Sequence, residues 1–113
     1  MRCSRLSVAG AFHSEHMAPA AEGLAKVLES VDLRAPSVPV WSNVTAQPHS
    51  SESSTIRSNL VAQLTSPVRW AESCQNFPAA GTIEFHESAP GTVLRGLMRR
   101  IDRERKVTSH DEP

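Results

Sequence analysis

Two histidines near the start of the chain are the first residues whose types and spacing could do chemistry. His13 and His16 lie three positions apart, with Glu15 between them, in the stretch AGAFHSEHM. Imidazole and carboxylate groups are ligands that Zn²⁺ uses, but this spacing is not that of the H-E-x-x-H motif. Neither Cys3 nor Cys74 stands at a spacing that would complete the set. We therefore expect no metal site.

His13 taken alone has two further readings. The small and apolar residues at 5–12, RLSVAGAF, are typical of a short buried strand, and His13 would stand at its end. Ligands bind at the carboxyl ends of strands in open α/β sheets, and a histidine there suits general-base catalysis. The alternative is a structural histidine whose ring is satisfied by backbone hydrogen bonds. The residues alone leave both readings open.

A general base needs a nucleophile to activate, and the sequence offers no obvious one. No serine of the chain lies in a G-x-S-x-G motif, the strand-to-helix turn that exposes a nucleophilic serine. Cys74 falls within an apolar helical pattern, so we expect it in the core. The stretch GTVLRG at 91–96 is neither a P-loop nor a dinucleotide fingerprint.

Seven elements are predicted to position these residues. A helix capped by Ser14 should start at Glu15, because apolar residues then recur every three to four positions. In chain order, the predicted elements are a strand at 5–12, the helix from Glu15 closed by residues 34–36, a strand at 37–45, a helix from Ser53 or Ser54 to about Leu64, a helix starting at Ser66 and Pro67, a strand at 82–87 and a last helix that buries apolar residues of 93–101.

This order of strands and helices favours an α/β layer architecture with parallel strand pairings. About three strands make a thin sheet, which indicates one portion of a larger α/β domain. Residues 103–113 are polar and charged without an apolar period, so we expect a disordered tail there. The predicted organisation is therefore a folded part at 1–102 and a tail at 103–113.

Composition excludes several classes of function. The 113 residues include 12 Lys and Arg and 12 Asp and Glu, so the absence of net charge gives no reason to expect nucleic acid or an anionic membrane as partner. No stretch approaches the roughly 18 apolar residues of a membrane span, and the start lacks the apolar run of a signal peptide. Two cysteines far apart suit a reducing compartment. We expect a cytoplasmic protein.

Four stretches in a fixed order carry a resemblance to a known family. LSVAGAFHSEHMAPAAEGLAKVL, VPVWSNVTAQP, IRSNLVAQLTSPVRWAES and APGTVLRGLMRRI together resemble the C-terminal portion of the bacterial-type malonyl-CoA:acyl carrier protein transacylases. The resemblance covers about residues 6–101. It implies part of the large, α/β-hydrolase-like subdomain of an acyltransferase, without the small ferredoxin-like subdomain that precedes this region in the family.

The resemblance also assigns roles to three residues. In the family, a serine takes the malonyl group from coenzyme A and passes it to the phosphopantetheine thiol of acyl carrier protein, with no other cofactor. His13 would be the general base of this Ser-His dyad, oriented by the backbone carbonyl of Gln63. Phe12 would crowd the malonyl α-carbon and so favour malonyl over methylmalonyl.

The departures from the family set limits on this reading. The nucleophilic serine, the oxyanion-hole residues and the arginine that binds the malonyl carboxylate all precede the matched region, and Ala89 of SAPG stands where a glycine is usual. We expect no transfer by the chain alone, and association with a complementary N-terminal acyltransferase segment. Two alternatives are a noncatalytic module whose basic run at 95–106 binds the acidic acyl carrier protein, and a truncated product without function.

Overall fold

A computed structural model of the chain describes residues 8–81, 84–88 and 90–110. The chain divides into two compact units, Met1–Val68 and Arg69–Pro113. The first unit is helical in its described part, and the second combines helices with a small sheet. Among the described residues, no helix has the length and apolar content needed to cross a membrane.

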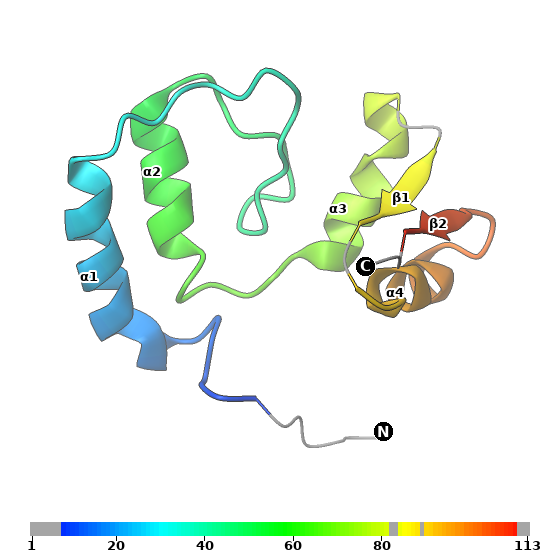
Figure 1. Cartoon of the computed structure of the whole chain (residues 1–113), viewed down its shortest axis with the longest axis horizontal. Coiled ribbons are helices and arrows are strands. Elements are labelled where there is room, and N and C mark those ends of the chain that lie inside the picture. The colour runs from blue at the N-terminus through cyan, green and yellow to red at the C-terminus, as the bar shows by residue number, and fades with distance from the viewer. Residues whose placement is uncertain (1–7, 82–83, 89, 111–113) are drawn as a thin grey trace. The chain divides into compact units, whose positions relative to one another are not determined.

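Two helices form the body of the first unit. A 3-10 turn, η1 (Glu15–Met17), leads into α1 (Ala18–Glu29), and α2 (Ser53–Ala62) packs beside α1 (Figure 1). Pro19 lies in the first turn of α1, where its missing N–H removes no helical hydrogen bond. The buried apolar residues of the two helices are Ala21 and Leu28 of α1 and Ile56 of α2.

Arg57 fastens α2 to the end of α1. Its Nε atom donates a hydrogen bond to the Leu28 carbonyl at 2.8 Å, and an Nη atom donates to the Val31 carbonyl at 3.2 Å. The Leu28 carbonyl lies in the last turn of α1, at the negative end of the helix dipole, and the Val31 carbonyl lies just beyond the helix. The guanidinium therefore stabilises the α1–α2 pair, a role that the sequence did not predict.

The first predicted strand is wrong in its described part. Residues 8–12 form no strand, and the side chain of Val8 is 68% exposed. Residues 5–7 lie outside the described part of the chain. A strand exists only where a neighbour accepts its backbone hydrogen bonds, and the described residues supply none here.

The predicted strand at 37–45 is also wrong. This segment makes one isolated bridge, between Trp41 and Pro48, because the chain turns tightly between these two residues. The buried Ser42 holds that turn, since its hydroxyl accepts the Val44 amide at 3.2 Å and its carbonyl accepts the Ala46 amide at 2.9 Å. The turn diverts the chain before a strand of the predicted length can form.

The second unit contains the sheet of the described chain. Helix α3 (Trp70–Asn76) and the 3-10 turn η2 (Pro78–Ala80) precede strand β1 (Phe85–Glu87), and α4 (Val93–Ile101) crosses over to strand β2 (Val107–Ser109). The two strands pair in parallel, with Phe85 opposite Val107 and Glu87 opposite Ser109 (Figure 1). The fold class is α/β, but with two short parallel strands in the described residues instead of about three.

Strand β2 corrects the prediction for the end of the chain. Residues 107–109 are paired with β1, so the expectation of a disordered tail is wrong for them. Val107 and Thr108 are β-branched and suit a strand, but three residues are too few to reveal a strand by their pattern. Residues 111–113 lie outside the described part, and the division at residue 102 stays a prediction.

Side chains alternate between the two faces of this ribbon. Phe85 packs against Phe77 with ring centroids 6.1 Å apart, and Glu87 is only 2% exposed. Met98 of α4 and Cys74 of α3 are each 3% exposed and form the core of the unit. The opposite face of the ribbon remains open to solvent.

Candidate functional site

His13 adopts a backbone conformation that few residues tolerate. Its φ angle is 62°, in the left-handed region, where the side chain of an L-residue is strained. The His13 amide donates a hydrogen bond to the Leu64 carbonyl at 3.0 Å, which holds the backbone in this state. The end of α2 therefore fixes the position from which the imidazole projects.

The imidazole itself is held by the residue next to that carbonyl. The His13 Nδ1 atom lies 2.9 Å from the backbone oxygen of Gln63, the residue that follows the last residue of α2. Because a carbonyl only accepts, Nδ1 carries the proton in this contact, and Nε2 of the neutral ring is then the basic nitrogen. Nε2 is thus the ring nitrogen that keeps a lone pair.

Phe12 and Ser14 flank the histidine. The Phe12 side chain is 56% exposed, and its ring folds back toward Gly10 so closely that a Cβ atom at Gly10 would lie 3.3 Å from Cε2. The hydroxyl of Ser14 donates to the Ala11 carbonyl at 2.6 Å instead of capping the helix. The prediction that the Ser14 side chain caps a helix is therefore wrong, although Ser14 does precede η1.

The other candidate groups of the sequence belong to different parts of the chain. His16 is an exposed residue of η1, and Cys3 lies outside the described residues. Cys74 belongs to the second unit, where burial raises the pKa of its thiol. Among the residues that the structure describes, no three His, Cys, Asp or Glu side chains are grouped to hold a metal ion.

A buried carboxylate in the second unit escaped sequence reasoning. Glu87 accepts the amides of Leu94 at 2.7 Å and Arg95 at 3.0 Å, at the N-terminal end of α4, and the Ser109 hydroxyl at 3.2 Å. Burial raises the pKa of Glu87, but these hydrogen bonds and the charge of Arg95 outweigh it and hold the pKa below its ordinary value. The signal in the sequence was a carboxylate just before a turn that opens a helix.

The turn between Glu87 and α4 contains the departure from the family pattern. Ala89 lies outside the described residues. Gly91, two positions later, has a φ angle of 86°, a conformation that glycine adopts without the strain of a Cβ atom.

Comparison with known proteins shows which proteins the chain resembles. No family model matches it. The chain is 43% identical over 112 residues to the malonyl CoA-acyl carrier protein transacylase of Bacillus subtilis, covering 99% of this chain and 35% of the relative. The structure of the transacylase of Coxiella burnetii superposes with a TM-score of 0.88 at 36% identity, over 93% of this chain and 33% of that one.

A further solved structure is a malonyl-transacylase in complex with a type II polyketide acyl-carrier protein. It superposes with a TM-score of 0.90 at 35% identity, over 96% of this chain and 35% of that one. The chain thus spans about a third of the length of the relatives it matches. It is a homologue of the malonyl CoA-acyl carrier protein transacylases, an acyltransferase family, and corresponds to a C-terminal portion of them.

Proposed function

We propose that this chain supplies the histidine general base for transfer of a malonyl group from coenzyme A to acyl carrier protein. The observation that carries the proposal is the 2.9 Å contact between His13 Nδ1 and the Gln63 carbonyl, in a chain homologous to transacylases. The nucleophilic serine must come from outside these 113 residues, because the sequence holds no G-x-S-x-G motif.

The chemistry follows from the free nitrogen of the ring. In the first half-reaction, Nε2 accepts the serine proton as the hydroxyl attacks the malonyl thioester, and then gives it to the departing thiolate of coenzyme A. In the second half-reaction, Nε2 accepts the proton of the pantetheine thiol as its sulfur attacks the malonyl ester, and returns that proton to the serine. The Gln63 carbonyl keeps Nδ1 protonated throughout, so one nitrogen serves all four transfers.

Phe12 completes the proposal as a residue of the substrate-binding site. It immediately precedes His13 and is 56% exposed, so its ring is available to a substrate beside the base. A methyl branch on the malonyl α-carbon would compete with the ring for space. The preference is therefore for malonyl over methylmalonyl.

A graft into a relative tests the proposal. The full 113-residue chain replaces the homologous third of the Bacillus subtilis transacylase, and malonyl transfer to acyl carrier protein is measured against the chain alone and against the remaining two thirds alone. We expect transfer by the graft and none by either part. An inactive graft that is nevertheless folded, or a chain that transfers malonyl groups unaided, would refute the proposal.

A second candidate is a noncatalytic module that binds the acyl carrier protein. Arg95, Arg99 and Arg100 are exposed on α4, and such cations attract an acidic partner. Titration of the chain with acyl carrier protein at two salt concentrations discriminates the two functions. The binding module is favoured if the graft is inactive and if the chain binds acyl carrier protein in a way that weakens with salt and is lost in the double variant Arg99→Ala, Arg100→Ala. An inactive graft and no binding of acyl carrier protein favour a product without function.

A further inference from the structure

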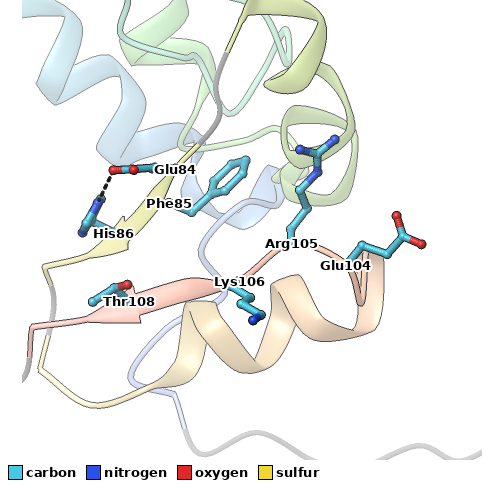
Figure 2. Close-up of a pocket in the computed structure, with 7 residues that line it drawn as sticks. All are labelled: Glu84, Phe85, His86, Glu104, Arg105, Lys106 and Thr108. Atoms are coloured by element: carbon cyan, nitrogen blue, oxygen red, sulfur yellow. Dashed lines mark ion pairs between the residues drawn. The ribbon is translucent and has the colours of Figure 1, made fainter.

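The exposed face of the β1–β2 ribbon carries a row of titratable side chains. Side chains alternate along a strand, so His86 of β1 and Glu84, the residue just before β1, share a face with Thr108, which lies opposite His86. His110 follows two positions later on that same face, as a diagonal neighbour of His86. The labelled residues of Figure 2 show Glu84 and His86 beside one another, with Thr108 on the adjacent strand.

The two histidines of this row are bonded to one another. The Nδ1 atom of His86 lies 2.9 Å from the Nε2 atom of His110, the ring centroids are 5.1 Å apart, and the ring planes differ by 25°. One of the two nitrogens must donate and the other accept. The contact therefore holds one proton, and a second proton between the rings would break it.

The contact lies where β2 ends. The last pair of the ladder joins Glu87 to Ser109, and the next amide, that of His110, donates to the Glu87 carbonyl at 2.8 Å. The hydrogen bond between the His86 and His110 side chains therefore adds a contact at the end of the β1–β2 pairing, which has only three residue pairs. So short a ladder has few other contacts to hold that end.

The charged groups near the pair lie on the His86 side. Glu84 lies 3.6 Å from the Nε2 atom of His86. Glu104, Arg105 and Lys106 line, with His86, a hollow of about 450 Å³ (Figure 2), and Arg105 is paired with Asp102 at 3.3 Å. On the opposite face, the Glu87 carboxylate is turned to the N-terminal end of α4.

We propose that the His86–His110 pair is a proton-operated latch that holds the end of strand β2 on β1 and releases it when both rings are protonated. The neutral pair is bonded through one ring proton. A single added proton keeps the bond and strengthens it, because a cationic donor bonds more tightly than a neutral one. A second proton places two N–H groups and two positive charges face to face.

The direction of the pH effect follows from these three states. The latch is closed at neutral pH and through the first protonation, and it opens as the pH falls further. Opening leaves the end of β2 held by backbone bonds alone and widens access to the hollow beside His86. The chain would then expose this edge of β1 to other partners at acid pH.

Amide exchange of the full chain tests the latch. Protection of the His110 amide, whose hydrogen bond to Glu87 depends on a docked β2, is measured by NMR between pH 8 and pH 5, alongside ¹⁵N shifts of the imidazoles. We expect the two rings to titrate as a coupled pair. The protection factor should fall about tenfold in the second step, after correction for intrinsic exchange.

A matched pair of variants separates the latch from general acid effects. Gln at position 86 can still donate to or accept from His110 but does not titrate, so His86→Gln should remove the acid step in protection. His16→Gln, at an exposed histidine of η1, should leave the step unchanged. Independent titration of the two rings, unprotected His110 at every pH, or the same acid step in His86→Gln would overturn the proposal.

Discussion

His13 and Gln63 lie 50 positions apart in the chain, yet His13 Nδ1 and the Gln63 backbone oxygen are 2.9 Å apart. The carbonyl becomes available because α2 ends at Ala62, and the last carbonyls of a helix have no partner within it. A helix end thus supplies the hydrogen-bond acceptor for this imidazole, the part that an aspartate plays in Ser-His-Asp triads. The side chain of Gln63 takes no part in the contact.

Replacing that side chain should therefore have little effect. In the graft, we expect Gln63→Ala to transfer malonyl groups at a rate within about twofold of the parent, because the backbone oxygen remains. Insertion of one alanine after Ala62 should instead turn the following carbonyls by about 100°. Steady-state rates should drop only for the insertion, and an equal loss in both variants would show that the side chain carries the role.

Truncation of Phe12 should relax the choice of substrate. A methyl group in or out of an apolar contact changes discrimination by about 1–3 kcal/mol. We expect Phe12→Ala to raise the ratio of kcat/KM for methylmalonyl-CoA over malonyl-CoA by about tenfold or more in the graft. Val8→Ala, at another exposed apolar residue, serves as control, and an unchanged ratio in Phe12→Ala would remove Phe12 from the site.

Removal of the Arg57 guanidinium should destabilise the helix pair of the first unit. Its two hydrogen bonds to the end of α1 are charge-assisted, so Arg57→Ala should lower the free energy of unfolding by about 1–2 kcal/mol. The control is Arg34→Ala, whose side chain is 86% exposed in its pair with Asp32 and should cost less than about 0.5 kcal/mol. Urea unfolding measures both, and equal effects would contradict the assigned role.

Neutralising Glu87 should change how stability depends on pH. Its pKa is held below the ordinary value in the folded state, so its contribution is fully present above the pKa of an unfolded glutamate, about 4.3. That contribution is lost as the pH falls through the folded-state pKa. Glu87→Gln should therefore lower the unfolding midpoint at pH 7 and flatten its fall below pH 5.

An exposed glutamate of α1 provides the comparison for this effect. Glu22→Gln should leave the profile of melting temperature against pH unchanged. A Glu87→Gln profile that runs parallel to that of the parent would show that the carboxylate contributes nothing pH-dependent.

Local patterns predicted the helices of this chain better than its strands. The apolar residues of α1, α2 and α4 recur with a helical period, and Pro19 stands where a helix can begin. A helix also makes its backbone hydrogen bonds within its own segment, so a local pattern is enough to predict it. A strand depends on a neighbour, so residues 37–45 could look like a strand and yet turn at Ser42. Strand β2 was not predicted, because three residues between polar neighbours show no strand pattern. They form a strand only because β1 lies beside them.

The candidate site divides in the same way. The family resemblance pointed to His13 and to the carbonyl of Gln63, and the structure brings these atoms together, whereas their catalytic roles stay predictions. The left-handed backbone of His13 leaves no mark in the sequence. Glu87 and the His86–His110 pair depend on the register of β1 and β2, which no local pattern specifies.

The central claim is that His13 transfers protons and is more than a packed histidine. Asparagine tolerates the left-handed conformation, so His13→Asn in the graft keeps that backbone accessible while removing the base. We expect kcat/KM for malonyl transfer to fall by about 10²–10⁴ with a melting temperature close to that of the parent, and no change in either for His16→Asn. Transfer within a few fold of the parent rate in His13→Asn, alone or with a lowered melting temperature, would contradict the account.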